Sequence, residues 1–165
     1  MLKSMRIGNK GEETVINLFN HCDIKAEKEN DKDKRYDHDI NCMIGKKKFT
    51  CEVKFDAMAC DTGNLAIEYW NSRKDKPSGL MVTKATAWVH LIKDGDNITV
   101  WIVNTNELKK YINENEPFKK LENIGDGNSN ILLYKMDDIL SVFDRIDNVS
   151  DSEVQKIVRK VINVK

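Results

Sequence analysis

Two short segments in the first third of the chain constrain its fold most. Residues 39–44 and 49–54 each alternate polar and apolar side chains, which is typical of β-strands with one buried face. Between them, Gly45-Lys46 can form a two-residue turn with glycine at its first central position. We therefore expect a β-hairpin in which Asp39 lies opposite Glu52.

The two faces of this hairpin differ in character. One face carries Asp39, Glu52 and Lys54 and has few apolar side chains, so it is not simply part of a core. A turn centred on Lys46-Lys47 would change the pairing and keep the same two faces. The other face can pack against a helix and consists of Ile40, Cys42, Ile44, Phe49, Cys51 and Val53.

Periodic patterns elsewhere indicate an α/β fold, with a mixed β-sheet flanked by α-helices. An apolar stripe at helical spacing predicts the first helix at 10–22. Other helices are expected at 107–115, 137–146 and 152–164. Strands are expected at 65–70, 88–93, 98–104 and, as a short edge strand, 131–134. We expect one domain over 1–165, with a core at 8–104, a C-terminal helical part at 105–165 and an exposed connection at 25–35.

Composition narrows the class of protein. The 27 basic and 27 acidic residues cancel, which argues against bulk attraction to nucleic acid but not against a local grip on it. No apolar run approaches the roughly 20 residues that span a bilayer, so no membrane partner is expected. Residues 1–10 lack the apolar segment of a signal peptide, which predicts a cytoplasmic protein of a bacterial, archaeal or phage-infected host cell. The four cysteines form no C-x-x-C pair, so we expect reduced, mostly buried thiols rather than a zinc site.

The polar face of the hairpin predicts a metal site. Two carboxylates that face each other across paired strands repel, and each raises the pKa of the other. Mg²⁺, or Mn²⁺ as its substitute, relieves this repulsion and needs only one or two carboxylates beside waters and a substrate phosphate. We expect Asp39 and Glu52 to bind the metal, and Lys54 to orient or deprotonate a water or to neutralise charge at phosphorus. The alternative is a solvated outer face on which Lys54 bridges the two acids.

The combination of Asp39 with Glu52-Val53-Lys54 resembles the PD-(D/E)xK nuclease superfamily, whose members share the restriction-endonuclease-like fold. The spacing and the preceding Lys10-Gly11-Glu12 look most similar to archaeal Holliday-junction resolvases, and 61–69, 76–80 and 83–85 are similar to phage-encoded relatives. The resemblance implies a metal-dependent DNA endonuclease in which Asp39 and Glu52 are the Mg²⁺ ligands. It also implies that Lys54 is the catalytic lysine and Glu12 an accessory catalytic acid. The chain departs from the pattern at His38, where the family has proline, and at Glu12, which follows the glycine directly.

Other polar residues can join this site. Asp37 shares its face and is an alternative ligand to Asp39, unless it pairs with Lys54; Glu68 can approach the metal from the strand at 65–70, unless it is simply exposed. Glu12 also suits the first turn of a helix without any catalytic role. His38 is expected to point away from Asp39. Candidate DNA-binding residues are Lys46, Lys47, Lys48, Arg73, Lys74, Lys76, Ser78 and Lys84.

The prediction is therefore a Mg²⁺-dependent endonuclease that hydrolyses DNA phosphodiesters, either structure-specific like a junction resolvase or restriction-like. The alternatives are a non-catalytic DNA-binding or assembly protein that keeps the nuclease fold, and a protein-interaction domain whose acidic face meets a basic partner. A homodimer is expected by analogy, because two strands must be cut. The DNA structure that is cut stays open at this point.

Overall fold

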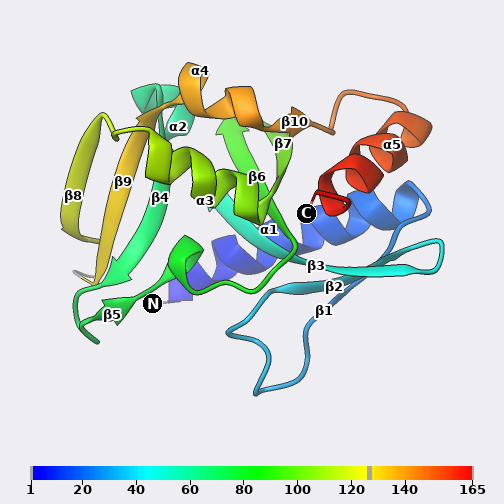
Figure 1. Ribbon diagram of the computed structural model, residues 1–165, viewed down its shortest axis with the longest axis horizontal. Coiled ribbons are helices and arrows are strands. Elements are labelled where there is room, and N and C mark those ends of the chain that lie inside the picture. The colour runs from blue at the N-terminus through cyan, green and yellow to red at the C-terminus, as the bar shows by residue number, and fades with distance from the viewer. Residues whose placement is uncertain (1, 126–127, 165) are drawn as a thin grey trace.

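The computed structural model describes residues 2–125 and 128–164 and contains two β-sheets with helices packed around them (Figure 1). The larger sheet has six strands in the order β1-β2-β3-β6-β7-β10. Its members are β1 (Lys25–Lys28), β2 (Ile40–Ile44), β3 (Lys47–Asp56), β6 (Ala87–Asp94), β7 (Asn97–Asn104) and β10 (Asp144–Arg145). Strands β3 and β6 pair in parallel, while the other neighbours are antiparallel, so the predicted mixed sheet is confirmed.

The smaller sheet has four antiparallel strands in the order β5-β4-β9-β8. They are β5 (Lys76–Pro77), β4 (Asn64–Asn71), β9 (Ser129–Lys135) and β8 (Lys119–Ile124). Figure 1 shows this sheet at the opposite end of the molecule from the turn of the β2–β3 hairpin.

In the part of the chain that the structure describes, five α-helices complete the fold: α1 (Leu2–His21), α2 (Ala59–Thr62), α3 (Thr105–Glu114), α4 (Met136–Ile139) and α5 (Asp151–Ile162). Short 3₁₀ turns, η1 (Gly79–Met81) and η2 (Leu140–Val142), adjoin β5 and α4. Helix α3 begins after Asn104 and α5 after Ser150, and each of these side chains accepts hydrogen bonds from backbone N–H groups of the first turn. None of the described helices has the length and apolarity needed to cross a membrane.

Two apolar cores lie on the two faces of the larger sheet. Helices α1 and α5 cover one face, where Val15 and Phe19 of α1 pack with Cys51 and Val53 of β3. The second core fills the space between the other face of β6–β7, the smaller sheet and α3. Strand β6 supplies both cores, because all its residues from Ala87 to Ile92 are buried. The half of that second face formed by β2 and β3 lies outside this second core.

The hairpin has the predicted register. Ile40 pairs with Cys51 and Ile44 with Lys47, and Gly45 adopts a positive φ of 59° in the turn between them. The hairpin of β6 and β7 is also confirmed, as are the helices at α1, α3 and α5, although α1 begins earlier than predicted.

Several expectations about elements were wrong in part. Residues 65–70 form a strand, but it belongs to the smaller sheet, and 131–134 lies inside that sheet instead of at its edge. The segment 25–35 contains β1, which has four residues and carries a charged side chain, Lys28, at one of its two less exposed positions, so its alternation is weak. Strand β8 was not predicted, since nearly all its side chains are exposed, and it adds to the part beyond residue 104 a strand that pairs with β9.

The predicted helix at 137–146 is interrupted. It ends at Ile139, continues as η2 and then becomes the short strand β10. The reason is that Ile139 and Phe143 are buried in the second core, whereas Ile146 is buried in the first. A single straight helix could not place its residues on both sides of the larger sheet.

Candidate active site

Asp39 lies directly before β2 and is held by the backbone of β3. Its N–H donates to the carbonyl oxygen of Cys51 (2.9 Å), and its Oδ2 accepts from the N–H of Val53 (2.8 Å). Burial raises the pKa of this carboxyl group, and the negative charge of Glu52 raises it further. The predicted electrostatic conflict between the two acids is therefore present at Asp39.

Glu52 lies on β3 in the register that places it across from Asp39. Its side chain is 12% exposed, and both carboxylate oxygens have partners. Oε1 is 3.1 Å from Nζ of Lys54, and Oε2 accepts from Oγ1 of Thr83 at 3.2 Å. A buried carboxylate with two fixed oxygens is suited to bind a cation in one orientation.

Lys54 follows on the same face of β3, and its Nζ lies 5.9 Å from the centre of the Trp88 ring. Burial acts to lower its pKa, but the charges of Glu52 and Asp39 prevail and raise the pKa above that of an ordinary lysine. Lys54 is consequently an ammonium ion at neutral pH, which suits a group that neutralises charge more than one that removes a proton.

Thr83 is a site residue for which the sequence suggested no role. It follows η1 and is buried, and its hydroxyl lies within hydrogen-bond distance of Glu52 and of the backbone oxygen of Asp37 (3.1 Å). Thr83 therefore joins the loop before β2 to the carboxylate of β3. Its position in the chain, far from the hairpin, gave no signal of this contact.

The three other predicted acids have partners of their own. Glu12 pairs with Lys28 (3.1 Å), and its neighbour Gly11 lies against Phe55 on the opposite face of β3 from Glu52. Asp37 pairs with Lys84 (3.0 Å) and not with Lys54. Among the described residues, no three His, Cys, Asp or Glu side chains converge as a metal site, so the donors on offer are the carboxylates of Asp39 and Glu52.

Glu68 reaches the neighbourhood of the site from the second sheet. Its Oε1 accepts from the Ser78 hydroxyl at 2.7 Å, and its charge contributes to the raised pKa of Lys54. The predicted DNA-binding residue Ser78 thus donates its hydroxyl proton to the carboxylate of Glu68 in this structure.

The two carboxylates of the hairpin fit a hard divalent cation. Both supply oxygen donors, and burial together with the charge of Glu52 raises the pKa of Asp39 despite the opposing charge of Lys54. Bound Mg²⁺ would favour the ionised form of both acids. Mg²⁺ commonly binds one or two carboxylates together with waters and a substrate phosphate, so Asp39 and Glu52 are a suitable pair of donors.

The predicted basic residues lie at two places. Lys46, Lys47 and Lys48 form the exposed hairpin tip, where Lys47 contacts Asn163 and Lys48 shares the face of Glu52. Arg73 and Lys74 are exposed between β4 and β5, Lys76 is exposed in β5, and Lys84 is engaged by Asp37.

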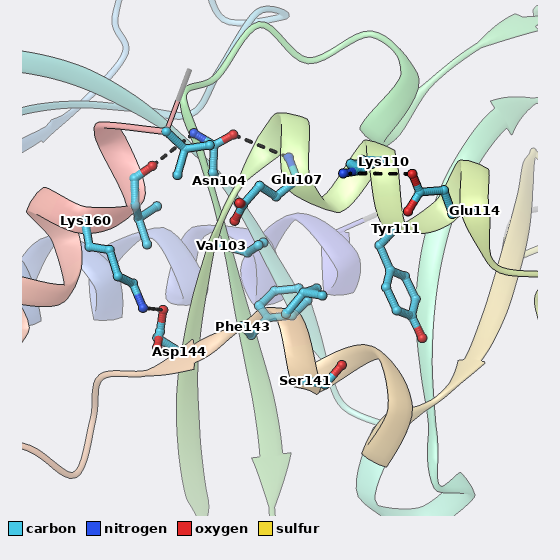
Figure 2. A pocket seen from close by; sticks show the side chains of 13 residues that line it. Val103, Asn104, Glu107, Lys110, Tyr111, Glu114, Ser141, Phe143, Asp144 and Lys160 are labelled. Atoms are coloured by element: carbon cyan, nitrogen blue, oxygen red, sulfur yellow. Dashed lines mark hydrogen bonds and ion pairs between the residues drawn. The ribbon is translucent and has the colours of Figure 1, made fainter.

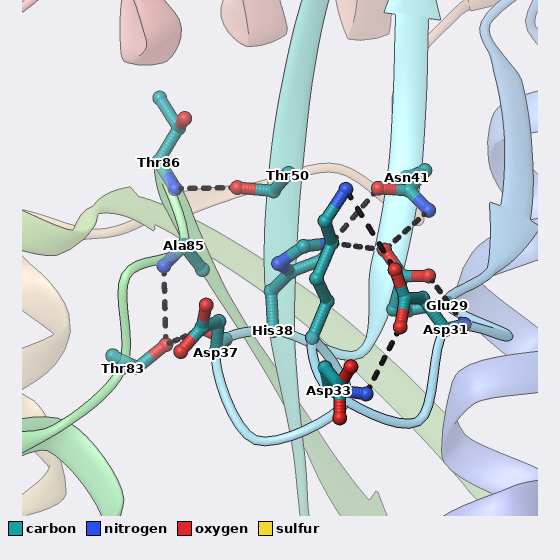
Figure 3. Close-up of polar contacts among 11 residues, drawn as sticks. Glu29, Asp31, Asp33, Asp37, His38, Asn41, Thr50, Thr83, Ala85 and Thr86 are labelled. Carbon is teal, nitrogen blue, oxygen red and sulfur yellow. Dashed lines mark hydrogen bonds and ion pairs between the residues drawn. The ribbon is translucent and has the colours of Figure 1, made fainter.

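His38 points away from the site, as predicted. Its Nε2 lies 3.0 Å from Oε2 of Glu29 and 2.8 Å from Oδ1 of Asn41 (Figure 3). The cysteines are all free thiols, and Cys60 is the exposed one. A separate hollow between α3, η2 and α5 contains the Lys160–Asp144 and Lys110–Glu114 ion pairs, and no predicted site residue lines it (Figure 2).

Comparison with solved structures relates this fold to a nuclease. The chain is similar to a bacterial homing endonuclease, I-Ssp6803I, with a TM-score of 0.54 and 12% sequence identity, over 96% of this chain and 92% of the other. No protein-family model and no curated protein sequence matches the chain. At this identity the similarity concerns the fold, so the chain has a nuclease-like α/β fold with a mixed sheet and flanking helices.

Proposed function

We propose that this protein is a Mg²⁺-dependent DNA endonuclease of the PD-(D/E)xK type. The observation that carries the proposal is the meeting of Asp39, Glu52 and Lys54 on one face of two paired strands. The structural similarity to a homing endonuclease supports it at the level of the fold. DNA is the proposed substrate and water the nucleophile.

Each residue has a distinct role in the proposed reaction. Asp39 and Glu52 would hold Mg²⁺, which supplies charge stabilisation at the scissile phosphate and a more acidic water. Thr83 and the Val53 N–H fix the orientation of the two carboxylates. Lys54, kept protonated by its acidic neighbours, stabilises the negative charge that builds up on the phosphate oxygens.

Cleavage of both strands of a duplex requires two such sites. We propose that a homodimer supplies them, with one site facing each strand. Light scattering on the protein alone and with DNA tests this point: a monomer in both states contradicts it.

The cleavage experiment compares four variants on linear duplex, branched and single-stranded DNA with Mg²⁺ or Mn²⁺. Asp39→Asn, Glu52→Gln and Lys54→Ala are each expected to reduce cleavage by at least about 10²-fold, because each removes charge at the reacting phosphate. Lys110→Ala removes an exposed ammonium in the middle of α3 and is expected to cleave like the wild type. Circular dichroism checks that all four variants are folded.

Full activity in any of the three site variants contradicts the assigned roles. A wild-type chain that binds DNA and cuts none of the three substrates identifies the alternative, a DNA-binding or assembly protein that retains the fold. If the chain neither cuts nor binds DNA, both the nuclease proposal and the DNA-binding alternative are wrong, and only the fold assignment is supported.

A further inference from the structure

An exposed tyrosine lies close to the candidate active site in the chain. Tyr36 is three residues before Asp39, and 70% of its surface is exposed. The guanidinium carbon of Arg35 lies 5.0 Å from the centre of the Tyr36 ring, and Arg35 Nη2 donates to the tyrosine hydroxyl at 3.0 Å. Arg35 thus holds the ring while most of its surface faces solvent.

The segment that carries Tyr36 is fixed to the site. The backbone oxygen of Asp37 accepts from the Lys84 N–H (2.9 Å) and lies 3.1 Å from the Thr83 hydroxyl, which also contacts Glu52. Figure 3 shows Asp37 and Thr83 side by side. The Thr83 hydroxyl, which has one proton to donate, thus lies between the backbone that follows Tyr36 and the carboxylate of Glu52.

Positive charge surrounds this tyrosine. The hydrogen bond from Arg35 and the charge of Arg35 both lower the pKa of Tyr36. Lys74, in the β4–β5 connection, and Lys76, in β5, lower it further. Among the described side chains, Arg35, Lys74 and Lys76 form no ion pair. These cations are available to an anionic ligand.

Three acidic side chains of the same segment have partners of their own. Asp37 is engaged by Lys84, Asp31 by Lys34 and by the Asp33 N–H, and Glu29 by His38 and Asn41. An exposed aromatic ring beside unpaired cations favours a nucleic-acid strand: the ring suits a base and the cations suit its phosphates.

We propose that Tyr36 stacks on an unpaired base of the DNA bound at this site, while Lys74 and Lys76 contact the adjacent phosphates. Stacking needs a base whose face is open, so the preferred DNA contains an unpaired nucleotide beside the phosphate that is cut. This inference rests on the proposed function and narrows its substrate to branched, gapped or flapped DNA.

The test measures binding, in the presence of Ca²⁺, to a fully paired duplex and to the same duplex with a short single-stranded gap. All proteins carry Glu52→Gln, so that binding is read without cleavage. Tyr36→Ala is expected to weaken binding to the gapped DNA about 10- to 100-fold and to leave duplex binding nearly unchanged. Tyr36→Phe, which keeps the ring, is expected to bind both DNAs like the parent.

Phe118→Ala is the matched control. Phe118 is 57% exposed, and Lys135 Nζ lies 3.7 Å from its ring centre, so it is also an aromatic ring with a cation beside it. It precedes β8 in the sequence, distant from the candidate site residues, and its removal is expected to change neither affinity. Lys74→Ala and Lys76→Ala are expected to weaken binding to the paired and to the gapped DNA by the same factor, and to reduce the salt dependence of binding.

Equal binding of Tyr36→Ala and its parent to the gapped DNA overturns the inference, as does an equal loss on both DNAs. These results leave the proposed function untouched if the wild-type chain cuts DNA. If the wild-type chain cuts no DNA and Tyr36→Ala still selectively loses the gapped probe, the proposed function fails and the base contact stands. A parent that binds neither probe contradicts both.

Discussion

The ionised carboxylate of Asp39 destabilises the fold when no cation is bound. This carboxylate is partly buried beside Glu52, and the single hydrogen bond from Val53 N–H does not remove the conflict between them. A residue placed only for stability would be neutral at this position. Such stored electrostatic cost is typical of a site that binds a cation.

This cost predicts how stability depends on pH. Because folding raises the pKa of Asp39, the folded protein holds the proton more tightly than the unfolded chain, and the contribution of Asp39 to stability is largest at low pH. It is lost as pH rises from the ordinary value of 3.8 through the raised pKa. Asp39→Asn is therefore expected to increase the thermal midpoint of the metal-free protein at pH 7.

Thermal unfolding of the wild type and of Asp39→Asn across this pH range measures the difference. The gain is expected to grow with pH and to reverse on addition of Mg²⁺, which would stabilise only the wild type. A gain that does not change with pH, or a loss at pH 7 without metal, contradicts the electrostatic explanation.

Strands with one buried face were the elements that the sequence predicted best. Residues 39–44 and 49–54 alternate strongly, and the turn glycines at 45 and 95 both have positive φ. Strands β1 and β8 were missed because they lie at sheet edges and bury little apolar surface. The hairpin part of the site was therefore predictable, and the Thr83 contact was not.

Gly79, the first residue of η1, lies very close to the backbone of β4. Gly79 has a φ of 54°, and a Cβ there would lie 2.3 Å from the backbone oxygen of Glu68. Gly79→Ala must move this segment, so we expect the free energy of unfolding to fall by at least about 2 kcal/mol. Activity is expected to fall with it, because Ser78 and Thr83 flank the same turn.

Gly63→Ala is the matched control for this substitution. Gly63 also has a positive φ, 70°, but nothing lies within 4 Å of the position of its Cβ. It is expected to cost only about 1 kcal/mol. Denaturant unfolding distinguishes the two variants, and equal losses contradict the close approach of Gly79 to β4.

At the scale of the whole molecule, the site depends on pairings between distant parts of the chain. All residues from Ala87 to Ile92 are buried and all but His90 are apolar, which is typical of a central strand covered on both faces. Strand β6 lies between β3, its parallel neighbour, and β7. The sequence does not reveal that β4 joins β9, which lies more than fifty residues later, in a second sheet. That sheet brings Glu68 and Ser78 to the site.

The central claim is that the β2–β3 hairpin binds one divalent cation between Asp39 and Glu52. Anomalous diffraction from a crystal soaked in Mn²⁺ tests it most directly. We predict one strong peak in contact with a carboxylate oxygen of each residue, at about 2.1 Å, and its loss in Asp39→Asn. The account is contradicted if saturating Mn²⁺ leaves no peak there, with Glu52 still bound to Lys54 and Thr83.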